Sequence, residues 1–338
     1  MTHLLQRRRC LAGLGGLLVT GLGLRPALAN PDVQRVSRAL MGTKVDIVAQ
    51  GDDPASTAVA IQAAFAEMQR LERMMSRYRA DSLVSALHRS AGRSWVDAPP
   101  ELMAVLQRAA ELSRLSDGAF DITVGAYDGW SFDAKHARIP SPAELRRERR
   151  LVDFREVSIN PQAGQVGLNR SGMRIDLGGV AKLPILQAGL RVLERHGLRN
   201  AMLNGGGDVL TRGQLLGRDW RVGIRDPRAP ERLIGTVFLG DGCVASSGDY
   251  ERCFVRNGRR YHHVLDPVSG MPSSGVRGVV LVSRQPDPVN GLGAAIMAAG
   301  AAAGQHLLSP LHEVDSLIVD RNASVRTTGR MDVRLQAA

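Results

Sequence analysis

The sequence predicts an α+β fold, a single domain with a mixed, mostly antiparallel sheet and packed helices in two lobes. Apolar residues recur at three- and four-residue steps over 58–75 and 100–115, which is typical of helices that bury one face. Short apolar runs at 220–224, 235–239 and 243–245 are typical of strands. Helical and strand patterns are intermixed without a repeating strand–helix–strand unit, so a doubly wound parallel sheet is not expected.

The first third of the chain predicts an extended segment and then three helices. Val33 to Gln50 reads as strand, interrupted at Met41-Gly42-Thr43. Asp53-Pro54 opens a helix that continues to Met75, and Asp81-Ser82 caps a second one. A third helix covers Pro100 to Leu115.

The middle of the chain alternates loops with short elements. Residues 117–125 are predicted to form a loop around a buried Phe120, and 140–150 a charged surface linker or insertion. Three short strand patterns follow between 152 and 175. A helix then runs from the glycines at 178–179 to about Arg195, and it tolerates Pro184 only in its first turn.

The last third predicts a sheet, a hairpin and one long helix. Asn257-Gly258 indicates a hairpin turn, and the strand from Tyr261 to Leu265 is stopped by Asp266-Pro267. Further strands are expected at 201–203, 278–283, 316–319 and 324–327. Residues 288–308 are expected to form a single Ala/Gly-rich helix.

Residues 1–29 have the features of a signal peptide, and 30–338 are the expected mature domain. Arg7-Arg8-Arg9 precede an apolar run to Leu24, and Ala27-Leu28-Ala29 resembles a cleavage site. Paired arginines suggest the twin-arginine route, which exports folded proteins, so a periplasmic location is expected. No stable membrane insertion is expected after cleavage, although an uncleaved anchor is the alternative.

Composition argues against nucleic acid as a partner. The formal charge is +11 and falls to +7 without the signal segment, but aromatic residues make up only 4% and no basic run interleaves them. The mature chain keeps Cys243 and Cys253, which either form a disulfide in an oxidising compartment or stay free.

Two stretches carry residues suited to chemistry. His262 to Gly270 places two imidazoles and a carboxylate at a strand end, although the same pattern is typical of a simple turn. Asp176 to Lys182 places two glycines and a lysine at a helix start, where open amides favour an anion.

Seven blocks in one order resemble the ApbE family, the FAD:protein FMN transferases. The blocks are Met41-Gly42-Thr43, Ser76-Arg77-Tyr78, 118–125, 176–182, 204–208, 246–250 and 263–267. The chain looks most similar to exported members that serve respiratory flavoproteins, including the NosX type.

The resemblance implies transfer of FMN from FAD to a threonine or serine of an acceptor flavoprotein in a respiratory membrane complex, with release of AMP and with Mg²⁺. It implies catalytic roles for His263 and Asp249. The implied flavin-site residues are Met41, Tyr78, Ala119, Phe120, Asp121, Asp176, Lys182 and Val264, and the implied metal-site residues are Gly179, Asn290 and Ala294.

Two departures weaken the resemblance. Asn290 and Ala294 stand where the family implies an aspartate and, four residues on, a threonine on one helix face, with Asp287 as a substitute only if the helix start shifts. Lys182-Leu183-Pro184 replaces the usual Lys-Gly-Tyr. A non-catalytic periplasmic FAD-binding accessory protein and an FAD pyrophosphatase are therefore the alternatives.

Overall fold

The computed structural model describes residues 32–133, 135–328 and 334–335, which belong to a compact unit spanning Pro31–Ala338. The predicted signal segment lies outside the described residues. Among the described residues, no helix is both long and apolar enough to cross a membrane.

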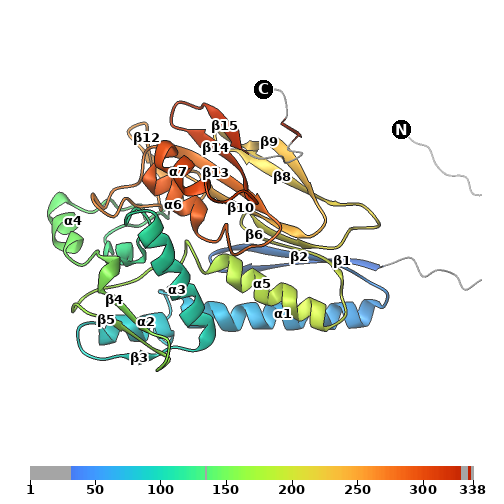
Figure 1. Cartoon of the computed structure of the whole chain (residues 1–338), viewed down its shortest axis with the longest axis horizontal. Coiled ribbons are helices and arrows are strands. Elements are labelled where there is room, and N and C mark those ends of the chain that lie inside the picture. Colours follow the sequence, from blue (N-terminus) through green and yellow to red (C-terminus); the bar gives the residue numbers. More distant parts are fainter. Residues whose placement is uncertain (1–31, 134, 329–333, 336–338) are drawn as a thin grey trace, which may run out of the picture. The chain divides into compact units, whose positions relative to one another are not determined.

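An eight-stranded sheet organises the fold and confirms the predicted α+β class (Figure 1). Every pairing between named strands is antiparallel, which goes further than the mostly antiparallel sheet expected from the sequence. In order across the sheet the strands are β1 (Asp32–Leu40), β2 (Thr43–Gly51), β6 (Asn200–Gly205), β7 (Asp208–Arg212), β10 (Gly242–Gly248), β13 (Val276–Ser283), β14 (Asp315–Asp320) and β15 (Val325–Thr328).

Two layers cover this sheet on opposite faces, and β13 shows why. Val279 and Leu281 join the core on the helical side, whereas Val280 and Val282 join a second core on the other side. This period-two division buries both faces of the strand. The helical layer contains α1 (Pro54–Met75), α5 (Lys182–Arg195) and α6 (Leu292–Ala299), and the other contains β8 (Trp220–Asp226) and β9 (Ala229–Leu239), with β16 (Arg334–Leu335) paired to β9.

Smaller elements extend the helical core beyond the sheet. A three-stranded sheet has the order β3-β5-β4, and two 3₁₀ turns lie between the helices of this region. The elements are α2 (Leu83–Ser90), β3 (Val96–Asp97), α3 (Pro100–Leu115), η1 (Ile122–Ala126), α4 (Pro142–Arg149), η2 (Phe154–Glu156), β4 (Val157–Asn160) and β5 (Gln165–Leu168).

Several sequence predictions need correction in this region. The charged stretch at 140–150 holds helix α4, closed by a reciprocal capping box between Ser141 and Glu144. Only two of the three strand patterns between 152 and 175 form strands, and the third, near 173–175, passes through the core as an irregular segment.

The predicted helix at 288–308 is two helices, α6 and α7 (Ala301–Leu308). Gly300 separates them at φ +89°, and Gly291 precedes α6 at φ +76°; neither angle is compatible with a continuing right-handed helix. Asn290 therefore lies outside α6, so the helical spacing expected between Asn290 and Ala294 is wrong.

The hairpin at Asn257-Gly258 forms as β11 (Cys253–Arg256) and β12 (Arg259–His262). The predicted strand to Leu265 stops at His262, because Val264 O accepts from Ser273 N (2.9 Å) and Leu265 bridges Pro272. Cys243 is buried, Cys253 is half-buried, and both are free thiols.

Candidate functional site

The start of α5 offers backbone amides to a ligand. Gly178 and Gly179 are exposed, and the N-cap residue Ala181 gives no side-chain hydrogen bond. Val180 N and Ala181 N already donate to Leu177 O (3.0 and 2.8 Å), so the start of α5 favours an anion through its partial positive charge and the amides that follow. Lys182, the first helical residue, lies with its Nζ 2.8 Å from Oδ2 of the buried Asp208.

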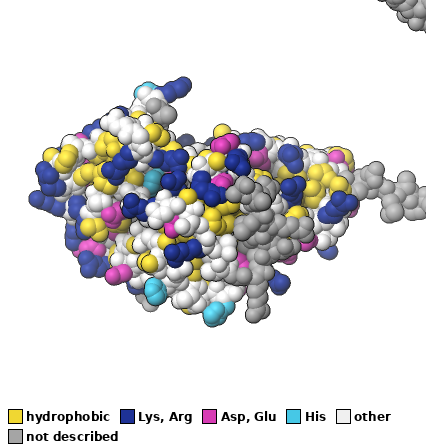
Figure 2. Space-filling view, turned by 90° about the horizontal axis from the view of Figure 1, so that it is seen from above, with side chains coloured by type: hydrophobic (Ala, Val, Ile, Leu, Met, Phe, Trp, Pro, Cys, Tyr) yellow, Lys and Arg dark blue, Asp and Glu magenta, His cyan; other side chains and the backbone are white. Residues whose placement is uncertain are grey.

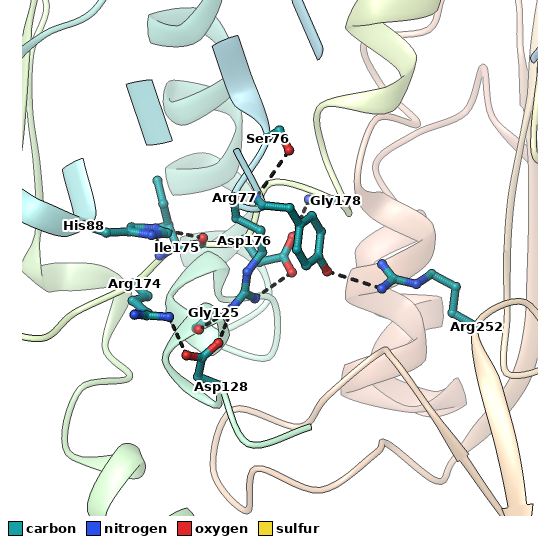
Figure 3. A network of polar contacts seen from close by, with 11 residues as sticks. Ser76, Arg77, His88, Gly125, Asp128, Arg174, Ile175, Asp176, Gly178 and Arg252 are labelled. Atoms are coloured by element: carbon teal, nitrogen blue, oxygen red, sulfur yellow. Dashed lines mark hydrogen bonds and ion pairs between the residues drawn. The ribbon is translucent and has the colours of Figure 1, made fainter. Parts of the chain in front are cut away.

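Asp176 is held just before this helix start by charge and by an amide. Arg77 Nη1 donates to Asp176 Oδ2 (2.9 Å), and Gly178 N donates to Asp176 Oδ1 (2.8 Å) (Figure 3). Burial alone would raise the pKa of Asp176, but Arg77 and the Gly178 amide outweigh burial and lower it. The carboxylate is therefore ionised at neutral pH.

A second layer of contacts fixes the Arg77 guanidinium. Arg77 Nη2 donates to Gly125 O (2.8 Å) and lies 3.3 Å from Asp128 Oδ1. Arg174 forms an ion pair with the same Asp128. The Arg77 side chain is only 15% exposed, so its charge depends on these partners.

His88 holds the backbone beside Asp176. His88 Nε2 lies within hydrogen-bond distance of both Ile175 N (3.0 Å) and Ile175 O (3.2 Å). Burial and the nearby positive charge of Arg77 lower the pKa of His88 to about 4. The segment that carries Asp176 is thus tied to α2.

Tyr78 and Arg252 are in contact at this site. Tyr78 is 73% exposed, and its hydroxyl accepts from Arg252 Nη2 (3.2 Å). The Arg77 guanidinium lies 5.7 Å from the centre of the Tyr78 ring. An exposed ring held between two arginines is suited to stacking against a planar anionic ligand.

His263 directly follows β12, and the charges of Arg252 and Asp176 act on its imidazole. His263 N donates to Arg252 O (3.1 Å), and its Nδ1 is buried with no hydrogen-bond partner among the described residues. Burial and the positive charge of Arg252 lower the pKa of His263 to about 4. The imidazole is neutral at pH 7 and has an unused nitrogen.

Asp249 directly follows β10 and precedes the β11–β12 hairpin. Its Oδ1 is 2.5 Å from Arg260 Nη1, and its charge raises the pKa of His262, which burial lowers overall. His263 instead feels Arg252, Asp176 and Lys182. The structure thus groups His263 with Asp176 and Lys182, and assigns Asp249 to an ion pair with β12.

The 116–125 segment packs its aromatic ring under the helix start. Phe120 is 8% exposed, and a Cβ placed on Gly179 would lie 3.2 Å from its ring, so glycine permits this approach. The neighbouring Ala119 is half-buried. Asp121 accepts from Thr123 N (2.7 Å) and from Phe154 N (2.9 Å), so its carboxylate caps η1.

Met41 and Val264 complete the set of predicted flavin-site residues. Met41 forms the turn between β1 and β2 with φ +55°, and both side chains pack partly against the helical core. Thr43, the first residue of β2, lies close to Gly206. A Cβ placed on Gly206 would lie only 2.5 Å from Thr43 Oγ1. This contact sets the β1–β2 turn over the glycine turn that precedes Asp208.

The predicted metal-site residues converge only in part. A Cβ on Gly179 would lie 3.6 Å from the Ala294 Cβ, and a Cβ on Gly291 would lie 3.4 Å from Gly179 O. Asn290 is 6% exposed and lines a cavity of about 420 Å³ between α1, α3 and α5, together with Asp287.

Comparison with known proteins places these residues in a family. Residues 41–318 match the model of the ApbE family. The chain belongs to the ApbE family. A relative from Treponema pallidum named FAD:protein FMN transferase is 31% identical, with 93% of this chain and 92% of the relative aligned. A Klebsiella pneumoniae protein of the same name is 28% identical over 88% of this chain and 92% of its own length.

Solved ApbE structures share the fold. The ApbE protein from Thermotoga maritima superposes with a TM-score of 0.79 at 29% identity, over 88% of this chain and 97% of that chain. The apo flavinyl transferase ApbE from Pseudomonas stutzeri gives 0.75 at 26% identity, over 88% and 94%. The FAD:protein FMN transferases are an enzyme family. We expect the reactive groups of this chain at the start of α5 and around His263.

The residues present do not fit the magnesium ion that resemblance to the ApbE family implies. Mg²⁺ prefers several hard oxygen ligands in octahedral geometry. Gly179 O is one such ligand, but Ala294 has no donor atom and Asn290 lies before α6. No group of three or more His, Cys, Asp or Glu side chains able to hold a metal occurs in the part of the chain that the structure describes.

Sequence reasoning missed four residues that shape this ApbE site. Arg77 and Asp208 lie within recognised blocks, but their partners Asp176 and Lys182 are distant in sequence. Neither His88 nor Arg252 lies within any of those blocks. Arg252 lies two residues after the 246–250 block, whereas nothing in the sequence near His88 indicated its role.

Proposed function

We propose that this chain is an FAD:protein FMN transferase that moves FMN from FAD to a threonine or serine of an acceptor flavoprotein and releases AMP. The observation that carries the proposal is a buried, neutral His263 within electrostatic range of Asp176 and of Lys182, the first residue of α5. This grouping suits an anion that reacts with a hydroxyl.

The proposed reaction breaks the phosphoanhydride bond of FAD and forms a phosphoester bond to the acceptor hydroxyl. The acceptor oxygen bonds to the phosphorus nearer the riboflavin, and the bond from that phosphorus to the bridging oxygen breaks. AMP leaves with the bridging oxygen, and the hydroxyl proton passes to a His263 ring nitrogen and then to AMP or solvent. Atoms and charge balance without an oxidant or reductant.

His263 is available as the base because its imidazole is neutral at pH 7. A pKa of about 4 makes a weak base in the empty site. A bound pyrophosphate adds negative charge, which favours the protonated imidazole and raises its pKa toward neutrality. Substrate binding would thus tune the base.

Charge on the pyrophosphate would be met by this chain's own groups. Lys182 and the amides of the α5 start lie on one side, and Arg252 lies across from them beside Tyr78. Preorganised donors of this kind stabilise phosphoryl charge as it shifts in the transition state. Of the expected metal-site residues, Gly179 would offer a divalent cation its backbone carbonyl and Asn290 an uncharged amide oxygen, whereas Ala294 would offer no ligand.

We further propose that the acceptor is an exported or membrane-bound flavoprotein of a respiratory complex and that the transferase acts in the periplasm after twin-arginine export. The support is the arginine-rich, apolar segment before residue 30. Fractionation of cells that express the full chain, with a variant carrying Arg7→Lys and Arg8→Lys as control, tests this location.

A non-catalytic FAD-binding protein is the second candidate, because Asn290 and Ala294 lack the charged and hydroxyl ligands. Incubation with FAD and an acceptor, followed by intact mass and nucleotide chromatography, separates the candidates. A flavin-sized mass increase on the acceptor with AMP supports the transferase, whereas free FMN with AMP indicates a pyrophosphatase. Bound, unchanged FAD would indicate the accessory protein.

A further inference from the structure

The hairpin that leads into His263 is unusually basic. Residues 252–265 contain four arginines and two histidines and no acidic residue. Helix α4 and its C-terminal end add four more arginines at 146, 147, 149 and 150. We call the exposed arginines Arg146, Arg252, Arg256 and Arg259 the basic rim.

The charges of the basic rim are not neutralised by neighbours. Arg256 donates to Ala137 O (3.3 Å), Arg252 donates to the Tyr78 hydroxyl, and the Arg259 guanidinium lies over the Tyr261 ring. None of the four meets a carboxylate within the described ranges. Arg260 on the same hairpin differs, because it is paired with Asp249.

Aromatic rings hold two of these guanidinium groups in place. Arg256 lies 5.7 Å from the Phe254 ring centre and Arg259 lies 5.1 Å from that of Tyr261. The two rings stack on each other with centroids 5.2 Å apart. Guanidinium groups fixed in this way lose little conformational freedom on binding a carboxylate.

Both elements that carry the basic rim connect to the segment around the candidate base. The chain passes from β12 straight into His263, and Arg149 of α4 donates from Nε to Val268 O (3.1 Å) on the turn that follows. Figure 2 shows Lys and Arg side chains interleaved with hydrophobic ones over the part of the molecule where α4 and β12 lie in Figure 1. Val255 and Val268, 64% and 71% exposed, add apolar contact there.

We propose that the basic rim docks an acidic, extended segment of the acceptor protein that flanks the hydroxyl to be modified. The inference rests on the proposed transfer, and it assigns substrate selection to a surface that adjoins the flavin site at Arg252. Opposite charges at a docking surface guide encounter and fix register. Because the rim adjoins His263, docking there brings the neighbouring hydroxyl to the base.

The binding test uses two fluorescent peptides with one threonine each. One peptide has four Asp or Glu residues around the threonine, and the other has Asn or Gln at those positions. We expect the wild-type chain to bind the acidic peptide about tenfold more tightly at low salt, with the preference shrinking as salt is added. The variant Arg256→Glu/Arg259→Glu should lose the preference.

The matched control is Arg199→Glu/Arg218→Glu, which makes the same change in charge on exposed side chains at the other end of β6. The control should keep the preference. Equal binding of the two peptides by the wild type, or equal loss in both variants, would overturn the proposal. Melting temperatures verify folding, and Arg256→Gln/Arg259→Gln is the milder substitute, expected to show a smaller loss.

Binding to lipid vesicles tests whether the rim contacts a lipid surface instead of an acceptor segment. A transfer assay tests whether the rim affects docking of the acceptor or the transfer reaction itself. If the rim variant loses binding to phosphatidylglycerol vesicles but keeps the peptide preference, the rim serves a lipid surface and the proposal is wrong. In the transfer assay, the rim variant should raise KM for the acceptor about tenfold and leave KM for FAD unchanged. A wild type that transfers no FMN would defeat the proposed function, while the peptide result would still decide the docking.

Discussion

Two corners of the site differ in how completely their polar groups are matched. Around Asp176, the paired corner of Arg77, His88, Asp128 and Arg174 satisfies each charge with a partner. Around Gly179, the open corner contains Ala294 and two glycines, and it offers one backbone carbonyl. The chain therefore keeps the means to position an anionic ligand and lacks most of the protein ligands for a cation.

This difference indicates which substitutions should cost the most free energy. Paired charges in a partly buried site are costly to disturb, because removing one partner leaves the other unpaired. Ala294 in the open corner has no polar side-chain group, so its replacement leaves no charge unpaired. Substitutions in the paired corner should consequently have the larger effects.

The largest effect is expected for His263→Asn, which removes the base beside the paired corner. Transfer should fall by about 10²–10⁴-fold, because a positioned general base contributes that much, while FAD affinity changes little. Single-turnover transfer and FAD titration measure the two quantities. Transfer at the wild-type rate would assign the base to another group.

Arg77→Gln should break the paired corner itself. Asp176 and Asp128 lose their shared cation, and the free energy of unfolding should fall by about 2–4 kcal/mol, less than for a fully buried pair since Asp176 is 32% exposed. Urea unfolding measures the change, and Arg77→Lys should recover part of it. An unchanged midpoint would show that solvent replaces the pairing.

The paired corner also predicts a dependence of stability on pH. His88 and His263 both have a pKa lowered to about 4, so the unfolded chain binds more protons between pH 6.5 and 4. Stability should fall as pH drops through this window and level off below it, by on the order of 2 kcal/mol for each histidine. His88→Gln should flatten the curve, and an identical slope in that variant would contradict the assignment.

The sequence predicted the fold better than the site for a physical reason. Pro100–Leu115 was predicted with its observed ends, because an amphipathic stripe and an N-terminal proline act locally. The break at Gly300 was missed, since glycine adopts helical angles as well as φ +89° and only packing decides between them. The helix α4 was predicted as a surface linker or insertion because its charged interior lacks an apolar stripe, although Ser141 and Glu144 have the spacing of a capping box.

Within the site, the sequence predicted features that depend on neighbouring residues, but it did not predict pairings between residues far apart in the chain. The anion-favouring start of α5 follows from the order of glycines and Lys182 along the chain. Arg77 and Asp176 are 99 residues apart, and Tyr78 and Arg252 are 174 apart, so no spacing rule links them. The imidazole of His88 gains its role only where Ile175 passes it.

The smallest expected effect comes from rebuilding the open corner. Ala294→Thr places a hydroxyl near Gly179 O. Asn290→Asp adds a carboxylate four residues before position 294. Together they should let Mg²⁺ stabilise the folded chain by about 1 kcal/mol, which raises the melting temperature by roughly one to four degrees in millimolar Mg²⁺. Transfer should rise only if a cation assists this enzyme.

The matched control for that variant is Ala298→Thr, one turn further along α6, with no oxygen ligand expected nearby. Because Asn290 lies before α6 and Arg108 Nε donates to its carbonyl oxygen (3.2 Å), the new carboxylate has a competing partner in Arg108. If the carboxylate introduced by Asn290→Asp pairs with Arg108, the double variant melts at a temperature independent of Mg²⁺, and Ala294→Thr alone behaves the same way. That result would mean that the backbone break at Gly291, and not only the two side chains, separates this open corner from a metal site.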